Sequence, residues 1–148
     1  MKFLTPKIMV VDDDPLYLTL IGQQFKNNGI KQVAFFESAL EGLKSDFGKP
    51  DIVFVDFHMN DINGARASKM FSKKWKQARI VLISNSESIK KKVKKSRYGI
   101  HDTVLKEADI SELLFQVKLA SRSMLLRLIW KVFAVLLVFV ALYYLFLF

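Results

Sequence analysis

Residues 50–64 read PDIVFVDFHMNDING, and this stretch decides how the chain folds. Within it, residues 52–55 are a continuous apolar run, typical of a strand that is buried on both faces of a parallel sheet. Asp56 follows the run directly, which places its carboxylate at the carboxyl end of the strand, where open α/β sheets bind their ligands. Taken alone, Asp56 is explained equally well as a helix cap or a turn residue.

The rest of the chain repeats this pattern of an apolar run followed by a helical segment. Five strands alternate with five helices, which indicates βαβ units, a parallel sheet covered on both sides and an α/β fold class. Spacing alone does not give the strand order. Strands are expected at residues 7–11, 32–36, 52–55, 79–83 and 101–105, and helices at 15–26, 38–43, 64–75, 86–98 and from 110 onward.

Length and composition indicate one domain with one appended element, because the chain has 148 residues. It contains no cysteine, which excludes disulfides and thiolate metal sites. The amino-terminal sequence MKFLTPK is too short in its apolar part for a signal peptide, so the globular part is expected in the cytoplasm. The formal charge of +9 raises nucleic acid as a partner, although the distribution of that charge matters more than its sum.

The appended element is an apolar segment at the carboxyl end. Residues 132–148 contain 17 residues without a charge, and extending the run back to Leu128 gives 21. A helix of that length reaches roughly 30 Å, the thickness of a bilayer core. The alternative is a buried core helix, but a segment that is apolar all round would need a far larger domain to cover it. The sequence therefore predicts one transmembrane helix.

Basic residues flank the amino-terminal side of this segment, namely Arg122, Arg127 and Lys131. The positive-inside bias then keeps the domain on the cytoplasmic side of the inner membrane, an arrangement that resembles a tail anchor. We expect a globular domain at residues 1–123 and a transmembrane segment at residues 124–148.

Four of the expected strand ends carry chemically active side chains: Asp12 and Asp13, then Asp56, Ser84 and Lys106. Clustered carboxylates favour a hard cation, Mg²⁺ before Zn²⁺. An ionised Asp is also a competent nucleophile toward phosphorus, with Lys106 and Ser84 placed to contact phosphoryl oxygens. Taken singly, Lys106 is explained as a solvated surface lysine and Ser84 as a helix cap.

Four motifs together identify a family. VVDDDP, VDFHMNDINGA, VLISNS and TVLKEAD resemble, in order and spacing, the signatures of the receiver domain of two-component response regulators. The resemblance covers about residues 6–122, and it implies a flavodoxin-like (βα)5 sheet in the order 2-1-3-4-5.

The resemblance also implies roles for the residues of the cluster. Asp56 corresponds to the phosphoacceptor, Ser84 to the switch hydroxyl and Lys106 to the lysine that contacts the phosphate. Asp12 and Asp13 correspond to the Mg²⁺-binding acids, with Asp56 and the backbone carbonyl of His58 as further ligands. The cofactor is then Mg²⁺. A metal site built on the imidazoles of His58 and His101 is not expected, because no second ligand pattern surrounds them.

Three positions depart from the family pattern. Asn60 stands where the family usually has proline, which leaves that loop less restricted. Glu107 replaces a proline whose bond is often cis; since a cis bond before another residue is costly, the loop is expected to be trans with Lys106 displaced. Thr103 replaces the usual Tyr or Phe, so the aromatic readout is expected to be altered or absent.

Two helices carry most of the positive charge, and a solvated face explains this as well as a binding surface does. Nothing after residue 123 fits a helix-turn-helix, so no DNA-binding domain is expected. Anionic lipid beside the fourth helix is the simpler partner for a tethered domain. The predicted lipid contact is the run from Lys90 to Arg97. The basic residues of the two helices are Lys69, Lys73, Lys74 and Lys76, then Lys90, Lys91, Lys92, Lys94, Lys95 and Arg97.

These inferences lead to a membrane-tethered single-domain response regulator. It would accept a phosphoryl group on Asp56 from a histidine kinase or a phosphotransfer protein, and would act on an unknown downstream protein or on the membrane. It would not be an enzyme beyond promoting its own phosphorylation and dephosphorylation. The alternative is a non-phosphorylated adaptor or scaffold that retains the fold. An aspartyl phosphatase is disfavoured, because it needs a second Asp where His58 stands.

Overall fold

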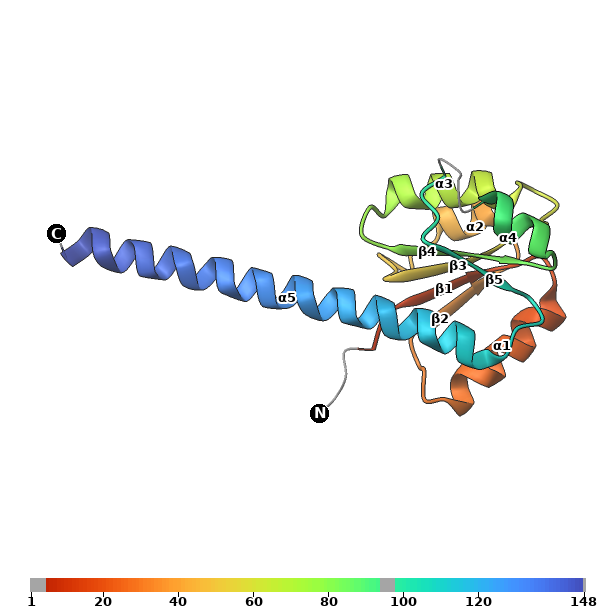
Figure 1. Ribbon diagram of the computed structural model, residues 1–148, viewed down its shortest axis with the longest axis horizontal. Helices are drawn as coiled ribbons and strands as arrows, with labels where there is room; N and C mark the ends of the chain where they lie inside the picture. Colours follow the sequence, from red (N-terminus) through yellow and green to blue (C-terminus); the bar gives the residue numbers. More distant parts are fainter. Residues whose placement is uncertain (1–4, 94–97, 148) are drawn as a thin grey trace.

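A computed structural model describes residues 5–93 and 98–147. These residues form a five-stranded parallel sheet with helices on both faces, and one long helix projects from it (Figure 1). The expected α/β class is therefore confirmed. The strands are β1 (Ile8–Val11), β2 (Val33–Phe36), β3 (Ile52–Asp56), β4 (Arg79–Ser84) and β5 (Asp102–Leu105), and the helices are α1 (Pro15–Asn27), α2 (Ala39–Lys44), α3 (Gly64–Lys74), α4 (Glu87–Val93) and α5 (Ile110–Leu147).

The strand order is β2-β1-β3-β4-β5, the flavodoxin-like order that the family resemblance implied. β1 and β3 are neighbours in the interior of the sheet, and Val11 of β1 pairs with Val55 of β3. Asp56 pairs with Ile83, so it is the last residue of β3 rather than the first residue after it. The carboxyl ends of β1 and β3 consequently meet at one edge of the sheet.

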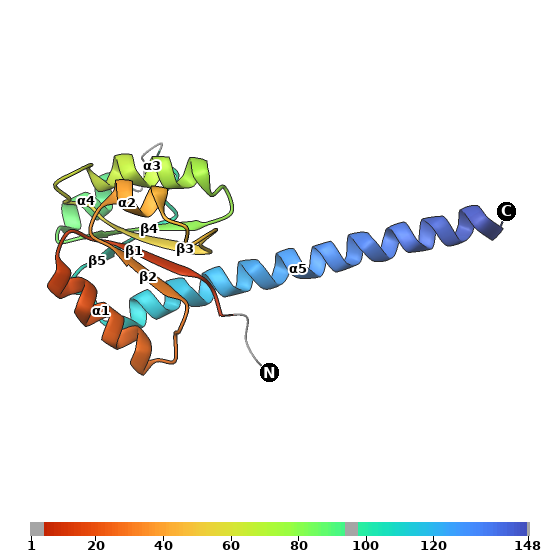
Figure 2. The ribbon, with the colours of Figure 1, turned by 180° about the vertical axis from the view of Figure 1, so that it is seen from behind.

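The core has two layers because the side chains of each central strand alternate between two apolar faces. Ile8 and Val10 pack with α1 and α5, whereas Met9 and Val11 pack with α2 and α3. All four are fully buried, which explains why these strands are continuous apolar runs instead of alternating ones. Figure 2 shows the same layering from behind, with α2 and α3 on the opposite side of the sheet from α1.

Helix starts follow the expected capping chemistry. Asp14 caps α1 by accepting hydrogen bonds from the backbone N–H groups of Leu16 and Tyr17, and Pro15 occupies the first turn. Ser38 caps α2, as its sequence position suggested. Each cap satisfies backbone donors that the first turn of a helix would otherwise leave unpaired.

The fourth helix is shorter than predicted in the part that the structure describes. It was expected to run to residue 98, but α4 is assigned from Glu87 to Val93, and Tyr98 lies in a bend. Residues 94–97 lie outside the described residues, as do the side chains of Lys90 and Lys92. The predicted lipid contact of the run from Lys90 to Arg97 therefore falls mostly outside what the structure describes.

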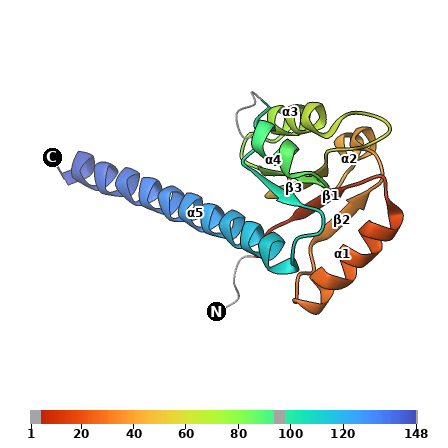
Figure 3. The ribbon, with the colours of Figure 1, turned by 45° about the vertical axis from the view of Figure 1, so that its right-hand side comes forward.

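The last helix, α5, is continuous over 38 residues, about 57 Å at the usual rise. Its first turns pack on the sheet through Leu113, Val117 and Ala120, and it then leaves the domain (Figures 1 and 3). Beyond that point its large apolar side chains are exposed; Trp130 is 68% and Phe146 90% exposed. Among the described residues, α5 is the one helix with the length and apolar composition to cross a membrane.

Polar contacts fix the direction in which α5 leaves the domain. Gln116 accepts a hydrogen bond from Arg79 and donates one to Asp102, which ties the helix to β4 and β5. Further along, the Arg127 guanidinium donates to the carbonyl oxygen of Gln77 and lies 3.8 Å from an oxygen of Asp51. Because Gln77 precedes β4 and Asp51 precedes β3, α5 passes the amino ends of the strands as it leaves.

Candidate functional site

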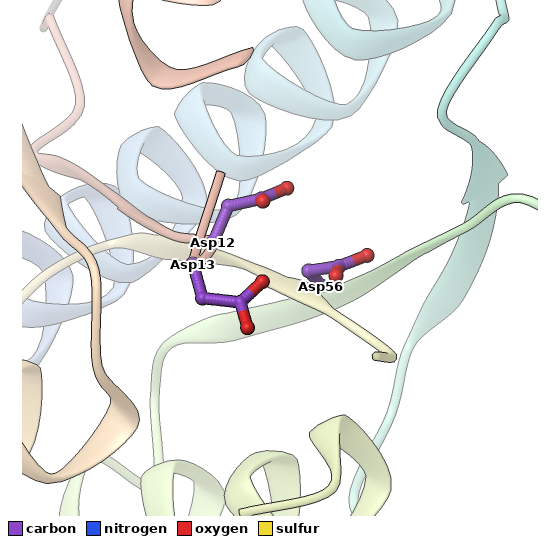
Figure 4. Close-up of side chains that lie close together, drawn as sticks. All are labelled: Asp12, Asp13 and Asp56. Carbon is purple, nitrogen blue, oxygen red and sulfur yellow. The ribbon is translucent and has the colours of Figure 1, made fainter. Parts of the chain in front are cut away.

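Three carboxylates meet at the carboxyl edge of the sheet. Asp12 and Asp13 follow β1 and Asp56 ends β3, and each contributes an oxygen to a group in which all lie within 4.8 Å of one another (Figure 4). Asp12 is fully buried and Asp56 is 3% exposed, while Asp13 is half-buried. The structure thus brings together all three acids that the sequence placed at this edge.

Lys106, which follows β5, lies among these acids. Its Nζ is 2.9 Å from Oδ1 and 2.8 Å from Oδ2 of Asp12, and 3.9 Å from Oδ2 of Asp56. Tyr17 of α1 covers it, with Nζ 4.5 Å from the ring centre. The described residues contain no cis peptide bond, so the bond to Glu107 is trans as expected. The expected displacement of Lys106 is wrong, because the trans loop still brings the ammonium to both carboxylates.

Burial raises the pKa of two of the acids, Asp12 and Asp56. Burial, followed by the charge of Asp12, raises the pKa of Asp56 to about 6, although Lys106 acts in the opposite direction. Burial also raises the pKa of Asp12, and the hydrogen bond from Lys106 only partly offsets it. One oxygen of Asp56, Oδ1, is buried and makes no hydrogen bond to the described residues. A buried carboxylate oxygen without a partner is energetically costly, and a bound cation would remove that cost.

The loop after β3 completes the site. The backbone N–H of Asn60 donates to Oδ2 of Asp13 at 2.9 Å. Proline has no N–H, so the family's usual residue at this position could not make this bond. The departure at Asn60 therefore ties the loop to Asp13, whereas we had expected a less restricted loop.

Ser84 is the last residue of β4, next to the end of β3 that carries Asp56, and Thr103 lies within β5. Ser84 is fully buried and its hydroxyl accepts a hydrogen bond from the backbone N–H of Ser86 at 3.1 Å. It therefore stabilises the turn after β4 in this state, but it does not cap α4, because the Ser86 hydroxyl accepts the hydrogen bond from the N–H of Ser88 in the first turn. Thr103 is 1% exposed, and its hydroxyl has no hydrogen-bond partner among the described residues. A buried threonine cannot swing between positions as a large aromatic side chain can.

The two histidines lie in different places. His58 is exposed, and its ring packs edge-on against that of Phe57 with the centres 4.9 Å apart. His101 accepts a hydrogen bond at Nδ1 from the backbone N–H of Ile80, and burial lowers its pKa. Neither imidazole belongs to the carboxylate group found within the described part of the chain. The His58 carbonyl remains a predicted ligand.

These donors fit a hard divalent cation. They are carboxylate oxygens, which Mg²⁺ prefers, and Asp56 Oδ1 is a buried acceptor with its bonding capacity unused. The ligand set is incomplete without water or substrate oxygens, which is usual for Mg²⁺.

The family follows from comparison with known sequences. The sequence profile of the response regulator receiver domain matches residues 8–118, three quarters of the chain. The chain belongs to this family. Receiver domains are generally phosphoacceptors, and they typically bind Mg²⁺ through an acidic cluster such as Asp12, Asp13 and Asp56.

Individual relatives agree with this assignment. The receiver domain is 27% identical to the chemotaxis protein CheY of Listeria monocytogenes over 117 residues, which cover 78% of this chain and 98% of that protein. Among solved structures, the BeF3-activated DrrB receiver domain has a TM-score of 0.69 at 22% identity, covering 79% of this chain and 97% of that chain. The Francisella response regulator 1452 receiver domain has a TM-score of 0.68 at 24% identity, covering 80% and 98%. These structural matches show the fold.

Three contributors to the receiver site were not found from the sequence. Tyr17 covers Lys106, the Asn60 amide binds Asp13, and Gly64 lets α3 approach the end of β3. A Cβ on Gly64 would lie 2.0 Å from the carbonyl oxygen of Asp56. The NG pair at the start of α3 is a weak signal for Gly64, and the replacement of proline by Asn60 is a signal for the free amide but not for its partner. The sequence contains no signal for Tyr17.

Proposed function

We propose that this protein is a membrane-tethered, single-domain response regulator that accepts a phosphoryl group on Asp56. The donor would be a histidine kinase or a phosphotransfer protein, and the output a contact with a downstream protein or the membrane. The observation that carries the proposal is the cluster of Asp12, Asp13 and Asp56 with Lys106 beside it. The chain would act as a substrate of phosphotransfer and would promote only its own phosphorylation and dephosphorylation.

The proposed chemistry is a phosphoryl transfer to a carboxylate. An oxygen of Asp56 attacks the donor's phosphorus and forms a new P–O bond, while the bond from phosphorus to the donor breaks and its electron pair leaves with the donor nitrogen. The product is an acyl phosphate on Asp56. Because the pKa of Asp56 is about 6, its carboxyl group is mostly ionised, as attack requires, at pH values above about 6.

Lys106 and Ser84 would stabilise the charge that arrives with the phosphoryl group. The Lys106 ammonium lies 3.9 Å from Asp56, close enough to pair with a phosphoryl oxygen bound there. The Ser84 hydroxyl would donate to another oxygen once it rotates its hydrogen toward the site. That bond would add to the one it already accepts from Ser86.

Asp12, Asp13, Asp56 and the backbone carbonyl of His58 are the groups that would hold Mg²⁺. When bound, the ion supplies positive charge that offsets the repulsion among the acids and the phosphoryl oxygens. The protein contributes the fixed positions of these oxygens and the hydrogen bond that orients Asp13.

The domain boundary and the membrane orientation also belong to this proposal. Residues 1–123 would form the receiver domain, and residues 124–148 would form the transmembrane segment, whose uncharged part from residue 132 onward would cross the bilayer. The support is the exposed apolar surface of α5, which no other described element covers. The flanking Arg127 and Lys131 would keep the receiver domain on the cytoplasmic side of the inner membrane.

Phosphorylation is tested on the full chain in detergent micelles with Mg²⁺ and a small-molecule phosphodonor. Intact mass is expected to show one phosphoryl adduct on the wild type and none on the Asp56→Ala protein. Asp46→Ala, which removes an exposed carboxylate far from the cluster, is the matched control and should form the adduct normally. If the wild type forms no adduct with either a small donor or a phosphorylated phosphotransfer protein, the proposal is wrong and the adaptor alternative is preferred.

Lys106→Gln is expected to separate cation binding from transfer. Because the ammonium lies 2.8 Å from Asp12, its removal should tighten Mg²⁺ binding by about tenfold and slow adduct formation by at least about tenfold. Mg²⁺-dependent thermal shifts and a time course of intact mass measure the two effects. Lys118→Gln, an exposed change on α5, is the control. Unchanged binding together with an unchanged rate would contradict the role given to Lys106.

The membrane anchor is tested by fractionation. We expect the full chain to remain with the membrane pellet after carbonate extraction, and a chain ending at residue 131 to be released into the soluble fraction. The reason is that the apolar segment 132–147 supplies the hydrophobic burial that holds the protein in the bilayer. A full chain that carbonate releases would contradict the transmembrane assignment.

The adaptor alternative is favoured by one observation, the buried Thr103 at the position of the family's switching aromatic. A protein without that switch would bind its partners through a fixed surface. The adduct experiment decides between the two functions.

A further inference from the structure

A hollow of about 450 Å³ opens at the base of the domain, between the amino ends of the strands and the side of α5. It lies at the edge opposite the acidic cluster, because its lining comes from the connections that precede β3 and β4. Six of its lining residues are basic and one is acidic. The basic residues are Lys49, Lys73, Lys74, Lys76, Arg127 and Lys131.

The one acidic residue in the hollow, Asp51, offsets at most one of its six positive charges. Asp51 lies 3.8 Å from Arg127 and accepts a hydrogen bond from the backbone N–H of Lys7 at 3.0 Å. Lys74 is also engaged, since it donates to the carbonyl oxygen of Leu43 and packs 4.9 Å from the centre of the Trp75 ring. These contacts hold the walls of the hollow in place.

Three lysines of the hollow are free to bind an external anion. Lys49, Lys73 and Lys76 are exposed, and none makes an ion pair with another residue in the described ranges. Lys49 precedes β3, whereas Lys73 and Lys76 lie at the end of α3 and just after it. The three lysines thus line one hollow from two separate segments.

The position of the hollow along α5 decides which anion it would meet. Arg127 and Lys131 line it, and they are the last charged residues before the apolar segment that is proposed to cross the membrane. They are four residues apart, about 6 Å along the helix. The polar layer on each side of a bilayer is about 5 to 8 Å thick, so the hollow opens at the level of the lipid headgroups.

We propose that this basal hollow binds the phosphate headgroups of anionic phospholipids in the membrane that α5 spans. The inference rests on the proposed membrane anchor. Each basic residue at such a surface strengthens the attraction to anionic lipid, and the headgroups lie within a Debye length of all six. Anionic lipids are present at high density where the anchor places the hollow, which distinguishes them from nucleic acid or a soluble acidic protein.

Lipid binding here would fix how the receiver domain faces the cytoplasm. A domain held by both α5 and the hollow presents its base to the membrane and its carboxyl edge, with Asp12, Asp13 and Asp56, away from it. The phosphoacceptor edge is then accessible to a soluble donor protein. This site also differs from the predicted contact of the fourth helix, which uses other lysines.

The experiment uses the full chain in nanodiscs of neutral phosphatidylcholine, with or without phosphatidylglycerol. The sequence contains no cysteine, so Asp46→Cys provides a single attachment point for a fluorophore in the connection that carries Lys49. A lipid with a spin label on its headgroup quenches the fluorophore when the base of the domain lies on the membrane. We expect quenching at least about twofold stronger in the anionic nanodiscs, and a loss of this difference in high salt.

The decisive variant is Lys49→Gln/Lys73→Gln/Lys76→Gln, which leaves the structural contacts of Lys74 and Arg127 intact. Three charges should weaken docking by about 100-fold, which reduces quenching to the neutral-lipid level. The matched control, Arg66→Gln/Lys69→Gln/Lys91→Gln, removes three exposed cations of α3 and α4 that do not line the hollow, and should dock like the wild type.

Equal quenching in both lipids, or a hollow variant that docks like the wild type, would overturn the proposal. Docking that is lost in both triple variants would also overturn it, because the attraction would then depend on total charge. If soluble RNA or an acidic protein displaced the base from anionic nanodiscs at stoichiometric amounts, that partner would replace lipid. Thermal midpoints, adduct formation and carbonate extraction are measured on the same variants, so a failure of folding, of phosphorylation or of insertion is seen separately from a failure of docking.

Discussion

Asp56→Asn should make the Mg²⁺-free protein more stable than the wild type at pH 8, by about 2 to 3 kcal/mol. Burial and the charge of Asp12 raise the pKa of Asp56 from 3.8 to about 6, so at pH 8 the folded wild type holds an ionised carboxylate in an unfavourable place. A shift of about two units corresponds to about 3 kcal/mol of stability. Asparagine has nearly the same shape but cannot ionise, which removes this cost.

The pH dependence follows from the sign of the shift. Between pH 3.8 and about 6, the folded state binds more protons at Asp56 than the unfolded state does, so the contribution of this group to stability falls as the pH rises. Below pH 3.8 the carboxyl group is neutral in both states. The advantage of Asp56→Asn should therefore be full at pH 8, decline as the pH falls through 6, and be absent at pH 4 and below.

Urea unfolding in detergent with EDTA measures this effect. The sequence has two tryptophans, so a Trp130→Phe background leaves the fluorescence of the buried Trp75 as a probe of the receiver domain. Asp46→Asn, at an exposed carboxylate, is the control and should change stability little. Added Mg²⁺ should stabilise the wild type more than Asp56→Asn, because it binds only the ionised cluster well. An advantage of Asp56→Asn that persisted at pH 4 would contradict the electrostatic explanation.

The fold was predictable because its signals are local. The apolar runs that became β1 and β3 are buried on both faces, and their length and spacing were enough to indicate a parallel α/β sheet. Strand order was different: it came from the family resemblance, since each crossover could pass to either side without changing the spacing. The end of α4 was overestimated, because helical periodicity continues past Val93 in the sequence although Tyr98 is not helical.

The site was predictable only in part. Asp12, Asp13, Asp56 and Lys106 were found because parallel strands bring their carboxyl ends to one edge. Contacts that depend on the path of a loop were not found. The Asn60 amide reaches Asp13 across 47 positions of sequence. The replacement of proline shows that an N–H is present there, but not which acceptor it reaches.

Gly64→Ala, which adds a single methyl group, should lower both the stability and the phosphorylation rate of this protein strongly. Gly64 begins α3, and its N–H donates to the carbonyl oxygen of Phe57 at 2.9 Å. An added Cβ would lie 2.0 Å from the Asp56 carbonyl oxygen and 2.6 Å from the Cα of Phe57. Both atoms are backbone, so no side chain can rotate to make room. The start of α3 or the end of β3 must move, which we expect to cost about 3 kcal/mol.

The same movement should slow phosphorylation, because Asp56 shares the displaced backbone. A shift of about 1 Å at a reacting group can lower a rate by about 100-fold, and this is the reduction we expect in adduct formation. Gly42→Ala is the matched control: Gly42 lies within α2, its Cβ would make only ordinary 3.5 Å contacts with side-chain atoms of β1 and β2, and alanine also favours a helix. Gly42→Ala should therefore keep both the stability and the adduct rate of the wild type. A Gly64→Ala protein with wild-type stability would show that α3 can move away from β3, and the dependence of the acidic site on that close contact would be disproved.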